Sequence, residues 1–149
     1  MDIVEEIDRR RNTYAIDEPD RAYSEIRDLL DRRMHFDHVS EEKYFNDVEE
    51  KRIRSKIIAM EAFDNVTKEE HEIYITIDGQ ARELDIQVKS KLITHYPTEG
   101  WRNTLWYYAY RALYDKFLYG HVRHGYEPAV EEKLDELLHR IRQNVEANA

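Results

Sequence analysis

The sequence predicts an α+β domain, built from one antiparallel sheet with helices packed on it. Helical spacing and capping signals come first along the chain, alternating apolar residues replace them from about residue 52 to 94, and helical patterns return after Pro97. Helices and strands that are segregated in this way are typical of α+β domains. We therefore expect N-terminal helices, a three-stranded antiparallel meander, and two C-terminal helices packed on the sheet.

The length and composition favour a single domain. The chain has 149 residues, of which 41% are hydrophobic and 37% are charged. A domain of this size buries roughly two thirds of the surface that its unfolded chain exposes, which is enough for one core. No internal repeat, low-complexity tract or long linker divides the sequence, so we expect residues 1–149 to form one domain.

The region before residue 52 carries signals for three helices. Apolar residues recur at helical spacing within residues 2–11 and predict a short helix there. Pro19 follows two acidic residues, as at many helix starts, and predicts a helix that ends near Arg33. Ser40 precedes two glutamates in the manner of an N-cap and predicts a third helix as far as about Glu50. The buried stripe of this third helix would consist of Tyr44, Phe45 and Val48.

The pattern from residue 52 to 94 is typical of strands. Residues 72–77 and 84–89 alternate apolar and polar side chains, and Asp78-Gly79 between them matches a two-residue hairpin turn. Residues 52–63 predict the first strand of the meander, although they also allow the preceding helix to continue. A three-stranded sheet has two edges, so the strand over residues 72–77 is a candidate for pairing with another chain.

Two helices are expected after the meander. Residues 101–119 contain no Pro or Gly and are apolar around most of a helical circumference, which predicts a largely covered helix. Pro128 restarts a helix that is amphipathic. Its apolar residues recur at spacings of three and four, at Val130, Leu134, Leu137, Ile141 and Val145.

Charge and cysteine content exclude several classes of function. The net charge is −9, which disfavours binding to a phosphate backbone and makes nucleic acid an unlikely direct partner. The absence of Cys excludes disulfides, thiolate nucleophiles and Cys-based metal sites. The chain has 15 Arg and only 8 Lys beside its abundant acids, a balance typical of halophilic proteins and also compatible with an ordinary acidic surface.

Two histidine pairs have the same spacing and raise the question of a metal site. These are His35 with His38, and His121 with His124. Four imidazoles brought together could bind zinc or another borderline metal. The same residues also fit surface positions, especially His121 and His124, which are expected where the positive charge of a histidine favours a helix C-terminus. We therefore predict no metal ion and no cofactor.

Aromatic residues concentrate in the segment 101–119. One stripe of the expected helix suits core packing, whereas a second stripe suits contact with a partner, because Tyr and Trp contribute much of the binding energy at protein interfaces. The candidate interface residues are Trp106, Tyr107, Tyr110 and Tyr114 from this helix, with Ile73, Tyr74 and Ile75 from the strand that could pair with another chain.

The function expected from these features is non-enzymatic, because no nucleophile motif, paired acid and base or phosphate-binding loop is present. We expect a structural subunit that joins other protein subunits, as a homo-oligomer or in a hetero-assembly. Small α+β subunits build rings at the neck or tail of virus particles, so by analogy of fold alone we expect a connector, neck or tail component of a virion or similar ring assembly.

Two other functions remain open at this point. The first is a small-ligand-binding protein or small enzyme with a pocket between the sheet and the helix over residues 101–119, where His95 or His121 would transfer protons. The second is an acidic regulator that imitates nucleic acid, which the scattered acids do not favour. The N-terminus lacks a signal-peptide pattern and no membrane span is present, so we expect the cytoplasm or the particle as the location.

Overall fold

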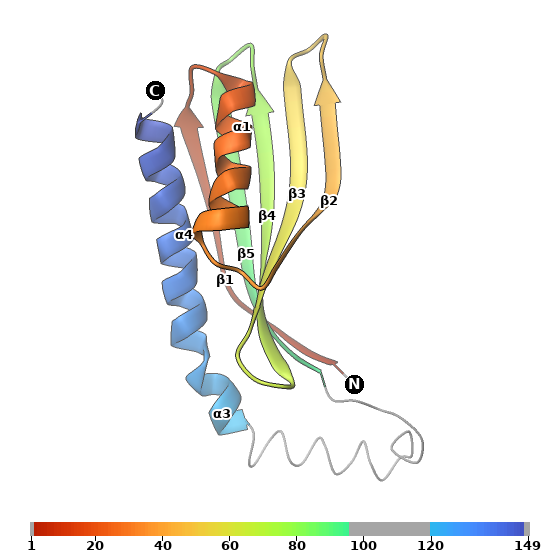
Figure 1. The fold of residues 1–149 in the computed structure, drawn as a ribbon, viewed down its shortest axis with the longest axis vertical. Helices are drawn as coiled ribbons and strands as arrows, with labels where there is room; N and C mark the ends of the chain where they lie inside the picture. Colours follow the sequence, from red (N-terminus) through yellow and green to blue (C-terminus); the bar gives the residue numbers. More distant parts are fainter. Residues whose placement is uncertain (1, 96–119, 148–149) are drawn as a thin grey trace.

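A computed structural model describes residues 2–95 and 120–147 as a twisted antiparallel sheet with two long helical segments on one face (Figure 1). None of the described helices combines the length and the apolar character that a membrane span requires. The strands are β1 (Asp2–Ala15), β2 (His38–Asp47), β3 (Arg52–Ala62), β4 (Thr67–Asp78) and β5 (Glu83–His95). The helices are α1 (Pro19–Asp28) with the π-helical turn η1 (Leu29–Arg33), α3 (Gly120–Gly125) and α4 (Glu127–Ala147).

The sheet has five strands in the order β1-β5-β4-β3-β2, so the expected three-stranded sheet is wrong. The three strands of the expected meander are present as β3, β4 and β5, and consecutive strands pair antiparallel. The two additional strands flank them, since β1 pairs with β5 and β2 pairs with β3. The expected N-terminal helices over residues 2–11 and 40–50 do not exist, because these segments form the two edge strands.

Edge strand β1 replaces the first expected helix. The register between β1 and β5 shifts between Glu6 and Asp8, which leaves Ile7 as the additional residue of a β-bulge. This bulge breaks the alternation that identifies a strand in a sequence. Most of the β1 side chains are also polar, and several of them form ion pairs in the folded protein. Arg11 forms an ion pair with Asp85 of β5, and Arg10 forms one with Asp135 of α4.

Edge strand β2 replaces the third expected helix for a similar reason. Its register with β3 shifts between Glu41 and Lys43, so a bulge at Glu42 again interrupts the alternation. Most β2 side chains are exposed, and no continuous apolar stripe exists to identify the element. Ser40 and the two glutamates after it match an N-cap, but pairing of this segment with β3 overrides that local signal.

The helix that begins at Pro19 is confirmed as α1, and η1 extends it to Arg33. Ile26, Leu29 and Leu30 form its buried stripe. Side chains of α4 bind the carbonyl groups at the end of η1, since Lys133 Nζ donates to Met34 O over 2.9 Å and Arg140 donates to Arg33 O over 3.2 Å. These bonds attach the first helical segment to the last.

The turn between β4 and β5 is longer than the two-residue hairpin expected from Asp78-Gly79. It spans residues 79–82, and Asp78 Oδ1 accepts hydrogen bonds from the backbone of Gln80 and Ala81. Arg82 adopts a left-handed conformation with φ of 53°. Gly79 lies against Lys51, where a Cβ would approach the Lys51 carbonyl oxygen to 2.8 Å, so this position requires glycine to accommodate the adjacent turn.

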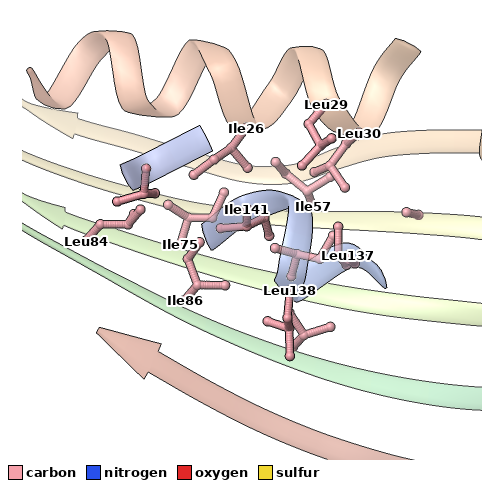
Figure 2. Packing of buried hydrophobic residues seen from close by; sticks show 14 of the residues in the cluster. Ile26, Leu29, Leu30, Ile57, Ile75, Leu84, Ile86, Leu137, Leu138 and Ile141 are labelled. Atoms are coloured by element: carbon pink, nitrogen blue, oxygen red, sulfur yellow. The ribbon is translucent and has the colours of Figure 1, made fainter. Parts of the chain in front are cut away.

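The core lies between the sheet and the two helical segments, α1 with η1 and α4. Figure 2 shows apolar side chains from α1, η1, α4 and the central strands meeting in this layer, among them Ile26, Ile57, Ile75 and Leu137. The amphipathic helix expected after Pro128 is confirmed as α4, whose apolar residues line this layer. The helix expected over residues 101–119 lies outside the described residues.

Candidate protein-contact surface

The face of the sheet opposite α1 and α4 carries polar side chains and is not covered by any of the described helices. Along β4, Ile73, Ile75 and Ile77 point into the core, whereas Tyr74 and Thr76 point to this open face. Cross-strand pairing places Tyr74 between Lys56 of β3 and Gln87 of β5. Tyr74 therefore lies in the middle of this sheet face, where it and its two neighbours are half-buried.

Charged groups surround the Tyr74 ring. The Nζ atoms of Lys56 and Lys89 lie 5.5 and 5.2 Å from its centroid, within the range of a cation–π interaction. Its hydroxyl donates to Glu72 over 3.0 Å, and Glu72 also accepts from Lys91 over 2.9 Å. Burial and the hydrogen bond to Glu72 raise the pKa of Tyr74, so the hydroxyl is neutral at physiological pH.

Exposed apolar side chains concentrate at the β2 edge of the sheet. Among the described residues, five large hydrophobic side chains are exposed, and three of them lie within residues 44–48. These are Tyr44, Phe45 and Val48, with 49, 57 and 79% of their surfaces exposed. Tyr44 lies beside the ring of Tyr23 on the helix side of β2, whereas Phe45 points to the opposite face, so exposed apolar surface flanks this edge on both sides. This edge is therefore the strongest candidate for a protein interface.

A depression of about 610 Å³ lies next to these residues, over β2, β3 and β4. Phe45 and Tyr74 give it an aromatic lining, and Lys43, Arg54 and Lys56 give it positive charge. The register places these five side chains together, because Lys43 is opposite Lys56, Phe45 is opposite Arg54, and Lys56 is opposite Tyr74. We call these five residues the basic aromatic depression.

The structure separates the candidate interface residues expected from the sequence. Tyr74 lines the basic aromatic depression, but Ile73 and Ile75 are buried in the core. Strand β4 pairs on both sides and is not an edge, so the expected pairing of this strand with another chain is wrong. Trp106, Tyr107, Tyr110 and Tyr114 lie outside the described residues. Phe45 was missed because its segment resembled a helix with a buried stripe.

The structure brings His124 together with two carboxylates. His124 Nδ1 lies 2.6 Å from Glu127 Oε1, and donor atoms of Glu5, His124 and Glu127 all lie within 4.8 Å of one another. Burial raises the pKa of Glu5 and the hydrogen bond with His124 lowers the pKa of Glu127, and the charge of Arg123 favours the ionised form of both, so a cation of the protein already faces this cluster. In the described part of the chain, His35 and His38 belong to no such group. The cluster therefore gives no specific argument for a metal ion.

A buried polar cluster lies on the helix-facing side of the sheet. His71 Nδ1 is 2.7 Å from Ser90 Oγ on the neighbouring strand, and His71 Nε2 is 3.5 Å from Glu69 Oε1. Ser, His and Glu in contact are the components of a catalytic triad. Glu69 is 2% exposed, however, and His71 and Ser90 are fully buried, so none of them offers a surface to a substrate. We interpret the cluster as structural.

The buried cluster predicts how stability depends on pH. Burial raises the pKa of Glu69, and the nearby carboxyl of Glu61 acts in the same direction while His71 opposes it. A raised pKa means that the folded chain binds this proton more tightly than the unfolded chain does. The free energy of unfolding should therefore fall as the pH rises from the ordinary pKa of a glutamate to the raised pKa.

The variant Glu69→Gln should remove this part of the pH dependence, because the amide does not ionise. Urea unfolding over about pH 4 to 8 measures the effect, and the variant should gain stability relative to the wild type as the pH rises. Glu70→Gln is the matched control, since Glu70 lies on the same strand and on the open face. Parallel stability curves for Glu69→Gln and the wild type would contradict the interpretation.

No known family model matches the sequence, and no curated protein is significantly similar to it.

Proposed function

We propose that this protein is a non-enzymatic assembly subunit that acts through protein–protein contact at the β2 edge of its sheet. The observation that carries the proposal is the concentration of exposed Tyr44, Phe45 and Val48 on this edge and the turn after it. An edge strand offers unpaired backbone groups, and adjacent aromatic side chains supply much of the binding energy at interfaces. The proposal includes a role as a connector, neck or tail component of a virion or similar ring.

Substitution of the exposed apolar residues tests this proposal. We expect the wild type to form a defined oligomer, most completely at about 1 M salt, where repulsion between acidic chains is screened. The double variant Phe45→Ser with Val48→Ser should remain a single chain under the same conditions, because it lacks the apolar contact. Light scattering after size exclusion measures both masses, and circular dichroism checks that the variant is folded.

Val122→Ser is the matched control for this experiment. Val122 is about as exposed as Tyr44, at 48%, but lies on α3 and away from the β2 edge. This control should assemble as the wild type does. A wild type that stays a single chain at every salt and protein concentration would contradict self-assembly, and a double variant that assembles normally would exclude the β2 edge as the contact.

A further inference from the structure

We infer that the buried cluster on the helix-facing side of the sheet is a proton-controlled latch, which holds the first half of α4 against the sheet and loosens it when one proton is lost. The latch joins three elements through Glu69 and His71 of β4, Glu61 of β3 and Lys133 of α4. This inference goes beyond the proposed function and does not depend on assembly, because all four residues belong to one chain.

The two carboxyl groups of the latch are cross-strand neighbours. Glu61 of β3 and Glu69 of β4 are directly opposite each other in the strand register. Like charges at such positions of an antiparallel pair destabilise it. The repulsion is stronger here than on an open surface, because Glu69 is buried and little water screens its charge. A buried carboxyl group in this position requires either a positive partner or a proton.

The cations of the cluster do not balance both carboxylates. Within the described residues, Lys133 Nζ lies 3.4 Å from Glu61 Oε2, whereas Glu69 has only His71 Nε2 at 3.5 Å. Two carboxylates and one ammonium leave one net negative charge, so the cluster is neutral only when it holds one further proton. Glu69 and His71 are the buried groups that can hold this proton. Burial also raises the pKa of Glu69, in agreement with this count.

Lys133 connects the charge balance to the position of α4. Its ammonium donates to Met34 O over 2.9 Å and lies 5.0 Å from the centre of the Phe36 ring. Lys133 is thus held between the end of the first helical segment and Glu61. The Phe36 ring in turn lies 5.6 Å from the ring of His71. A change of charge in the buried cluster therefore acts on the groups that hold α4 at this point.

Two other contacts hold the start of α4. Tyr126 stacks on Phe63 with 4.5 Å between the ring centres, and its hydroxyl donates to Asp64 over 2.8 Å. His124 lies 2.6 Å from Glu127 in an exposed pair, where water screens a change of charge. Since these contacts remain when the buried proton is lost, we expect the first half of α4 to loosen and not to detach.

The direction of the response follows from the number of protons bound. The attached form keeps the proton, whereas the loosened form exposes Glu69 to water, where it ionises at its ordinary pKa. Loosening therefore releases one proton, and its equilibrium constant should rise by up to about tenfold per pH unit above the ordinary pKa of a glutamate. The rise should end above the raised pKa of Glu69, because the attached form is then ionised as well.

Amide hydrogen exchange, corrected for the intrinsic rate at each pH, tests the latch. From about pH 5 to 9, protection of residues 127–136 in the wild type should fall by up to about tenfold per pH unit, while β4 and β5 stay protected. Glu69→Gln should keep protection at every pH, because the amide does not ionise. Glu61→Gln should reduce the total fall, since the Glu61 carboxyl contributes to the raised pKa of Glu69. The controls Glu70→Gln and His124→Gln should respond as the wild type does.

The outcomes separate the latch from other effects of pH. Constant protection of α4 in the wild type, or a wild-type response in Glu69→Gln, would overturn the latch. A parallel loss of protection in α4, β4 and β5 would also overturn it, because the proton would then control the whole domain. A fall that disappears in His124→Gln and persists in Glu69→Gln would assign the response to the exposed pair instead. The proposed contact at the β2 edge is tested separately, by the oligomeric mass.

Discussion

Ile73→Ala should lower the free energy of unfolding by about 2 to 5 kcal/mol. Ile73 is fully buried on the central strand β4, where its side chain contacts the layer between the sheet and the helices. Truncation removes apolar contacts and leaves a cavity that a strand paired on both sides cannot close. Urea unfolding followed by circular dichroism measures the loss as a lower transition midpoint with an unchanged slope.

Thr76→Ala is the control for this prediction, because Thr76 lies on the same strand but is exposed on the open face. Its effect should stay within about 0.5 kcal/mol. If Ile73→Ala instead left stability unchanged and reduced assembly, the residue would belong to an interface, as the sequence alone suggested, and the position of β4 in the sheet would be wrong.

His71→Ala should destabilise the protein by about 2 to 4 kcal/mol, through two effects that add. The imidazole is fully buried and its ring lies 5.6 Å from that of Phe36, so its removal leaves a cavity. It also leaves Ser90 Oγ without the nitrogen that lies 2.7 Å away, and it removes the group that faces the buried Glu69 carboxyl. Thermal unfolding at neutral pH measures the loss.

His139→Ala provides the comparison, since His139 is exposed on α4 and alanine favours a helix. This variant should unfold at nearly the wild-type temperature. Equal stability of His71→Ala and the wild type would show that the buried cluster contributes nothing, and the structural interpretation of the Ser90, His71 and Glu69 contacts would then fail.

The elements that could be predicted from the sequence are those with one apolar face buried in the core. The stripe of Ile26, Leu29 and Leu30 identified α1, and the alternation around Ile75 and Ile86 identified β4 and β5. In each case the side chains that the core requires recur at the period of the element. Burial and sequence pattern then carry the same information.

The edge strands could not be predicted in this way, because their stability comes from pairing and not from an apolar pattern. Most of β2 is exposed, and a bulge in each edge strand shifts the alternation by one residue. Short windows of β1 and β2 consequently satisfy the spacing of a helix. The candidate contact surface was missed with them, since Phe45 and Lys43 belong to β2 and Arg54 faces it.

The strand order also determines when each part of the sheet can form during synthesis. Strands β2 to β5 pair with neighbours in the sequence, but β1 pairs with β5, and Asp2 is matched with His95. The N-terminal strand therefore leaves the ribosome long before its partner exists, and contacts between such distant residues form slowly. Arg9, Arg10 and Arg11 place three positive charges on β1, and charged residues on an unpaired strand disfavour pairing with other nascent chains. The same charges that obscure the strand pattern of β1 thus also reduce its pairing with other chains before β5 is made.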